Sequence, residues 1–113
     1  MKNQQKRLYE GMYILNASLS EDALKKGLSR ITDLIEGHGG EVHKVHDQGR
    51  KKLASEINGH KQGYYYLLYF SVVPSAISEI WKEYHLNEDL LRFVTLRAEK
   101  VKEKIEFQPL AEV

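Results

Sequence analysis

An almost unbroken apolar run, from Tyr64 to Val73, is the feature that most restricts how this chain can fold. Aromatic and β-branched side chains dominate the run, and Gly63 and Pro74 bound it, which predicts a β-strand. Successive side chains of a strand leave opposite faces of a sheet, so this strand is apolar on both faces. It therefore belongs in the middle of a sheet, with both faces covered by the protein or by a partner.

Shorter patterns predict the other elements. Leu24, Leu28, Ile31 and Ile35 recur at helical spacing after Ser20, which is a suitable N-cap. The expected order begins with a strand over residues 8–16 and a helix from Ser20 to the glycines of residues 37–40. An edge strand over residues 41–47 follows, and then a polar connector or hairpin over residues 49–59 that contains a short strand piece. The aromatic strand comes next, followed by a helix with Pro74 in its first turn and a last strand over residues 91–97.

This order predicts an α+β domain of the ferredoxin-like split βαβ class (βαββαβ), with a four-stranded antiparallel sheet and two helices on one face. The first and third strands are central in that class, which agrees with their apolar character. The 113 residues suffice for one such core. We expect a flexible N-terminal extension over residues 1–6, the domain over residues 7–99 and a charged C-terminal tail over residues 100–113.

The alternation along the third strand predicts which side chains face away from the helices, on what we call the open face. Ser71 marks the outward set, so Tyr65, Leu67 and Tyr69 are expected there, whereas Tyr66 packs under the helices. This places more apolar surface in solvent than a solitary small domain usually exposes. A partner is expected to cover it.

The same argument applies to the first strand. Glu10 and Asn16 assign their side of the strand to the open face, so Tyr9 and Tyr13 are expected in the core. The alternation of the last strand does not determine which of its side chains face the helices.

The distribution of charge matters more than its sum, because the formal net charge is only +1. Basic side chains gather in three groups, and one side of the protein becomes cationic if the fold brings them together. The groups are Lys2, Lys6 and Arg7; Arg50, Lys51, Lys52 and Lys61; and Arg92, Arg97 and Lys100.

Several function classes find no support in the sequence. The chain has no cysteine, no apolar run of the roughly 18 to 20 residues that span a membrane and no signal-peptide pattern, so a cytoplasmic protein is expected. His43 and His46 lie three apart and are expected on opposite faces of a strand, which excludes a shared metal ion. Ser18 and Ser20 lack a paired histidine and acid. We predict no catalytic residue, metal, cofactor or small-molecule substrate.

A series of short motifs, in one order over residues 7–98, resembles the family of bacterial small-subunit ribosomal protein six. In its central signature Gly49, Lys51, Leu53, Ala54 and Ile57 match, whereas Ser55 replaces the usual tyrosine and Lys52 is less usual at its place. The other matching motifs are Tyr9-Glu10, Leu15-Asn16, Gly39-Gly40-Glu41-Val42, Lys44-Val45, Gly63-Tyr64, Pro74 and Arg92-Phe93-Val94.

The resemblance implies a structural component of the small ribosomal subunit. Such a protein binds the central domain of small-subunit ribosomal RNA together with small-subunit ribosomal protein eighteen, without catalysis or a cofactor. Arginine suits RNA contacts because its planar fork binds a phosphate through two hydrogen bonds. The expected RNA-binding residues are Arg7, Tyr9, Arg50, Lys51, Lys52, Arg92 and Arg97, and the expected partner-protein contacts are Tyr65, Leu67 and Tyr69. Arg7, Tyr9, Arg92 and Arg97 are expected to converge on the neighbouring first and fourth strands.

An RNA-recognition motif is the alternative, since it has the same topology and stacks single-stranded RNA on rings of its first and third strands. Residues 12–16 and 63–69 resemble its two motifs. The predicted alternation argues against it, because Tyr13 and Tyr66 are then buried. A regulatory domain that binds a small ligand is a third possibility that the fold alone leaves open.

Overall fold

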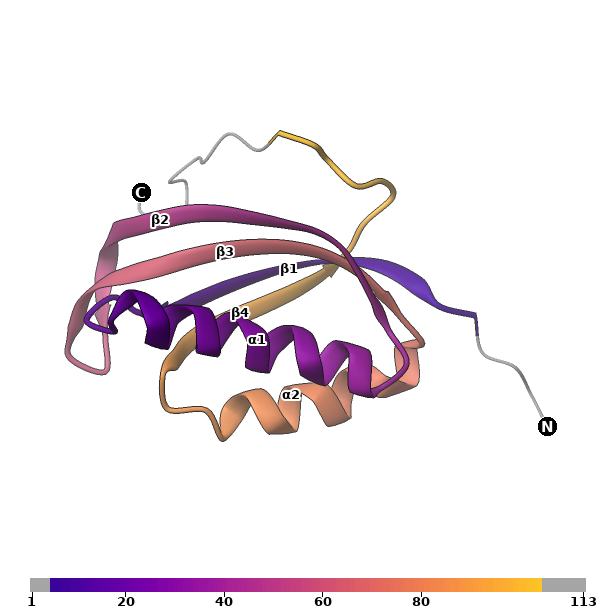
Figure 1. Cartoon of the computed structure of the whole chain (residues 1–113), viewed down its shortest axis with the longest axis horizontal. Coiled ribbons are helices and arrows are strands. Elements are labelled where there is room, and N and C mark those ends of the chain that lie inside the picture. The colour runs from indigo at the N-terminus through magenta and orange to yellow at the C-terminus, as the bar shows by residue number, and fades with distance from the viewer. Residues whose placement is uncertain (1–4, 105–113) are drawn as a thin grey trace.

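The computed structural model describes residues 5–104, which form a four-stranded sheet with helices α1 and α2 on one face (Figure 1). The strands pair antiparallel in the order β2-β3-β1-β4, so the predicted class is confirmed and the first and third strands are central. The elements are β1 (Arg7–Asn16), α1 (Glu21–Gly37), β2 (Glu41–Ile57), β3 (His60–Val72), the 3-10 turn η1 (Pro74–Ala76), α2 (Ile77–His85) and β4 (Leu90–Arg97).

Helix α1 begins and ends where the sequence predicts. The Ser20 hydroxyl accepts a hydrogen bond from the backbone N–H of Ala23 (3.1 Å), which satisfies one of the unpaired groups of the first turn. Gly39, with φ +81°, follows the helix in the left-handed conformation that glycine favours. Before α2, Pro74 opens the short turn η1 and lies outside the α-helix itself.

Strand β2 is longer than predicted. The polar connector expected over residues 49–59 is mostly strand, because β2 continues to Ile57 and β3 begins at His60. Asn58 and Gly59 form the two-residue turn between them, both with positive φ (50° and 84°). An Asn-Gly pair favours this type of hairpin turn, so the signal was present in the sequence.

Tyr13 lies at the centre of the main core, between the sheet and the helices. It is fully buried, its ring meets the ring of Tyr84 edge-on at 5.4 Å, and the two hydroxyl oxygens lie 3.2 Å apart. Burial raises the pKa of Tyr84 to about 12 and that of Tyr13 well above its ordinary value. Tyr66 is buried in the same core, which confirms the predicted alternation of β1 and β3.

The pairing of β1 with β4 determines the direction of the β4 side chains. Phe93 lies opposite Tyr13 and contacts the ring of Tyr84 (5.1 Å), so it faces the helices. Val94 and Leu96 pair with open-face positions of β1 and are 39% and 56% exposed.

The predicted exposure of the three open-face side chains of β3 is wrong. Tyr65, Leu67 and Tyr69 leave the expected face but are only 7%, 9% and 1% exposed. At one end of the sheet the β2–β3 hairpin covers Tyr65, because Leu53 packs with Tyr65 and Ile14 in a second, smaller core. At the other end Tyr69 lines a cavity together with Ala98, Glu99, Lys100 and Lys102.

Residues 98–104, which we call the strap, leave β4 and cross the sheet on the side opposite to the helices (Figure 1). The N–H of Ala98 donates to the carbonyl of Leu8 (3.0 Å), and the strap reaches β2 through two further contacts described below. The predicted charged tail therefore begins with residues that lie on the sheet. Residues 105–113 of that tail, and residues 1–4 of the predicted extension, lie outside the described residues.

Candidate nucleic-acid interface

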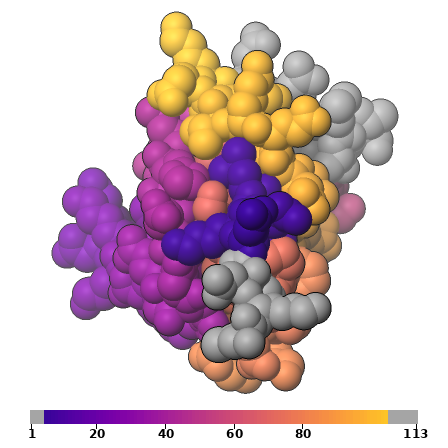
Figure 2. All heavy atoms as spheres, turned by 90° about the vertical axis from the view of Figure 1, so that its right-hand side faces the viewer, coloured from indigo at the N-terminus to yellow at the C-terminus, as the bar shows by residue number. Residues whose placement is uncertain are grey.

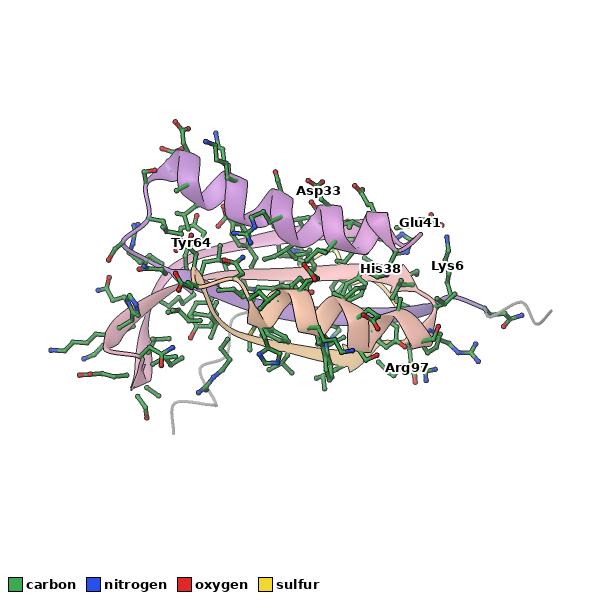
Figure 3. The ribbon with its side chains drawn as sticks, turned by 90° about the horizontal axis from the view of Figure 1, so that it is seen from below. Lys6, Asp33, His38, Glu41, Tyr64 and Arg97 are labelled. Carbon is green, nitrogen blue, oxygen red and sulfur yellow. The ribbon has the colours of Figure 1, made fainter. Side chains whose placement is uncertain are left out.

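The predicted RNA-binding residues lie at two opposite ends of the sheet. Figure 3 shows Lys6 and Arg97 at one end and Tyr64, the register partner of Arg50, towards the other. The fold therefore does not bring the three basic groups of the sequence onto one side. Two separate clusters result.

The first cluster, which we call the β1-start cluster, comprises Lys6, Arg7 and Arg97. Arg97 pairs with Tyr9 across β1 and β4, and Arg7 lies two residues before Tyr9, so both arginines belong to the same face. Both are exposed, whereas the Lys6 ammonium is paired with the Glu41 carboxylate at 3.1 Å. Two neighbouring guanidinium groups can bind the phosphates of one RNA backbone.

Tyr9 holds this cluster on the core and presents little surface of its own. Its ring is 7% exposed and stacks on Phe70 at 5.7 Å between centroids. The Tyr9 side chain thus anchors the start of β1 on the core.

Arg92 does not join the β1-start cluster, so the expected convergence of the four residues is wrong. It pairs with Ile14 and faces the open face, whereas Arg97 faces the other way. The two arginines are five positions apart on the strand, a distance of about 17 Å. Arg92 instead lines a groove with Asn58 of the hairpin turn.

The second cluster, which we call the hairpin cluster, comprises Arg50, Lys51, Lys52 and Lys61. Its Arg50 already has partners within the chain. The guanidinium donates two hydrogen bonds to the carbonyl of Ala17 (2.9 and 3.2 Å) and lies 5.8 Å from the centroid of the Tyr64 ring. Lys51 is half-buried, whereas Lys52 and Lys61 are exposed.

Tyr64 connects Arg50 to the adjoining strand. Its hydroxyl donates to both oxygens of the Asp47 carboxylate (2.8 and 3.0 Å). This hydrogen bond, with a smaller contribution from burial, raises the pKa of Tyr64 to about 12. Asp47 also accepts from the N–H of Gly49 (3.0 Å). Arg50 therefore belongs to a network that fastens the β1–α1 turn to β2.

We expect Arg50→Ala to lower stability more than RNA affinity. It removes the two hydrogen bonds to Ala17, and a net loss of about 1 kcal/mol in the free energy of unfolding is expected. Chemical denaturation measures this change, and Lys52→Ala, which alters an exposed side chain of the same cluster, is the control. An unchanged unfolding midpoint would contradict the structural role of Arg50.

The two histidines of β2 do not leave opposite faces as predicted. A shift of register between Val42 and Lys44 breaks the alternation, and His43 hydrogen-bonds Ser71 (2.7 Å) while His46 meets the Tyr69 ring edge-on (6.0 Å). Each ring thus contacts an open-face side chain. Within residues 5–104 no group of three or more histidines and acids is placed to hold a metal ion, and no helix there has the length and hydropathy to cross a membrane.

A groove of about 800 Å³ between α2 and β4 was not predicted. Trp81 is 38% exposed at this groove, donates from Nε1 to the Thr95 hydroxyl (3.2 Å) and has its ring 6.3 Å from that of Phe93. Val94, which is 39% exposed, lines the same groove. The sequence carries no direct signal for this groove, because the alternation along β4 does not determine which of its side chains face the helices.

The alternative of an RNA-recognition motif does not fit these positions. Tyr13 and Tyr66, which would have to stack on bases, are 0% and 5% exposed beneath the helices. Tyr65 and Tyr69 face the other side but are covered. The central strands therefore present no stacking platform in this structure.

Comparison with known proteins gives one consistent result. The model of the family described as Ribosomal protein S6 matches residues 8–97. The chain is 59% identical to the small ribosomal subunit protein bS6 of Protochlamydia amoebophila, over 99% of this chain and 98% of that protein, and 58% identical to that of Chlamydia pneumoniae, over 99% and 100%. A crystal structure of 30S ribosomal protein S6 from Thermotoga maritima superposes with a TM-score of 0.78 at 27% identity, over 83% of this chain and 89% of that one.

Proposed function

Since the chain belongs to the ribosomal protein S6 family, we propose that it binds the central domain of small-subunit ribosomal RNA together with small-subunit ribosomal protein eighteen. It is a protein of the small ribosomal subunit, with a structural rather than an enzymatic role. RNA and other ribosomal proteins are its partners in general. The proposal concerns which of them it contacts, and with which side chains.

The β1-start cluster carries the RNA part of the proposal. Arg7 and Arg97 are exposed on one face at one end of the sheet, above a ring that is fixed in the core. The two planar guanidinium groups can bind phosphates of a folded RNA there. The exposed lysines of the hairpin cluster, with Arg92, offer a second point of contact about the length of the sheet away.

The open face supports the protein part of the proposal. Val94 and Leu96 are the exposed apolar side chains of β4 on this face, and they adjoin the β1 positions that pair with Leu67 and Tyr69. A partner protein removes such surface from water, which stabilises the complex. The predicted contacts Tyr65, Leu67 and Tyr69 then lie beneath or beside this partner.

The test is incorporation into the small ribosomal subunit. Tagged protein is expressed in cells, the lysate is fractionated with and without RNase, and both ribosomal RNA and protein eighteen are measured in the captured material. Co-sedimentation with small subunits that RNase abolishes is expected. Reconstitution of the purified protein with the RNA fragment, with and without protein eighteen, then separates the two contacts. A protein that binds neither would refute the proposal.

A further inference from the structure

We propose that the strap is a displaceable cover, which must leave the open face before the partner protein can occupy the Tyr69 end of it. The inference rests on the proposed function in one respect, namely that the partner uses this face. It adds that the free chain closes the same surface with its own residues. Closure and partner binding then exclude each other.

Three contacts hold the strap across the sheet. Its base is fixed by the hydrogen bond from Ala98 to Leu8, which continues the pairing of β4 with β1 (3.0 Å). Its far end reaches β2, where the Lys102 carbonyl accepts from His46 Nε2 (2.7 Å) and the Glu103 carboxylate pairs with the Lys44 ammonium (3.2 Å). Figure 2 shows the strap lying on the side of the molecule opposite to α2.

The Tyr69 side chain is held in place by contacts that do not involve the strap. Tyr69 donates its hydroxyl to the Glu10 carboxylate (2.7 Å), and its ring meets the ring of His46. Burial, with a further contribution from Glu10, raises the pKa of Tyr69 to about 12, so this hydroxyl stays a donor. Opening the strap would therefore expose an ordered ring beside the apolar side chains of β4.

The contacts of the far end are of a kind that opens easily. The Lys44 and Glu103 side chains are 37% and 75% exposed, and ion pairs in water contribute little to stability. The strap does not pack closely on the sheet along its whole length, because a cavity of about 410 Å³ is lined by strap residues together with Glu10, Tyr69 and Arg97. Its sequence offers few apolar groups to fill that space, since only Val101 is a large apolar residue among residues 98–104.

Thermodynamic reciprocity gives the test. If the partner binds only the open form, then fixing the strap weakens the partner's binding, and the partner in turn opens the strap. The chain has no cysteine, so the double variant Lys44→Cys, Glu103→Cys carries two unique thiols at the existing ion pair. A bismaleimide with a short disulfide spacer joins them, and a mild reductant cleaves the spacer in the same sample.

Binding to recombinant protein eighteen with the central-domain RNA fragment is then measured before and after cleavage. The cross-linked form is expected to bind at least tenfold more weakly than the cleaved form. Saturating partner and RNA are expected to slow the cross-linking of the double variant. The matched control is Glu21→Cys, Lys25→Cys on the exposed side of α1, where cross-linking is expected to change neither quantity, and circular dichroism checks that both variants are folded.

Two results would overturn the inference. One is equal binding by the cross-linked and cleaved forms; the other is a cross-linking rate that saturating partner leaves unchanged. Failure of the unmodified protein to bind at all is a different result, because it contradicts the proposed function and removes the premise of the inference with it.

Discussion

Replacing Tyr13 by alanine is expected to destabilise the domain by about 3 to 5 kcal/mol, because it deletes a large aromatic side chain from the main core. Tyr13 is fully buried and packs edge-on against Tyr84. RNA affinity should change little in the molecules that remain folded, because the ring has no access to a nucleic acid. Urea denaturation and an RNA-binding titration of the same preparation measure the two quantities.

Tyr13→Phe is the matched control, because it keeps the ring and removes only the hydroxyl that lies 3.2 Å from the Tyr84 hydroxyl. A loss of about 1 kcal/mol is expected from this change. A stable Tyr13→Ala variant with weakened RNA binding would instead mean that the ring stacks on a base, as the RNA-recognition motif requires.

The double variant Arg7→Ala, Arg97→Ala is expected to weaken binding to the ribosomal RNA fragment, with protein eighteen present, by about 100-fold. The loss of each arginine is expected to weaken affinity about tenfold, since a hydrogen bond to a charged group contributes about 1.5 to 3 kcal/mol. The slope of log affinity against log salt should also become shallower by about 0.7 to 0.9 for each phosphate that the variant no longer binds. Titrations from low to high salt measure both effects.

Lys25→Ala, Lys26→Ala is the control for the loss of two positive charges, because both lysines are exposed on α1. It should leave affinity and salt slope almost unchanged. An affinity that does not respond to salt in the unmodified protein would show that phosphate contacts are not what binds the RNA.

The fold could be predicted because several independent patterns agree. The apolar run of β3 requires a central strand, Ser20 begins a helix, and Pro74 follows the aromatic strand, and each of these local preferences suits the same topology. The directions of Tyr13 and Tyr66 then followed from the period of two along a strand. These features depend on neighbouring residues, which a sequence displays directly.

The site could be predicted only in part, because it depends on pairings between distant residues. The separation of Arg92 from Arg97 follows from the register of β4 against β1, and the sequence of β4 left its alternation open. The surroundings of Tyr69 include the strap, at least 29 residues further along the chain, which has no apolar pattern of its own. The role of Arg50 depends on a carbonyl, at Ala17, that any residue would supply.

The irregular pairing of β2 has a consequence for the chain before it reaches a ribosome. An edge strand of 17 residues with an even ladder would be a long template for a second copy, and a route to aggregation. The register shifts after Val42, Asp47 and Lys52 interrupt that ladder, and the charged side chains of Lys44 and Lys52 further oppose strand addition. Self-association through added strands is thereby directed to the shorter edge of β4, which has 8 residues and exposed apolar side chains. The free protein is protected along its longer edge, whereas the β4 edge keeps exposed apolar side chains that a partner would cover.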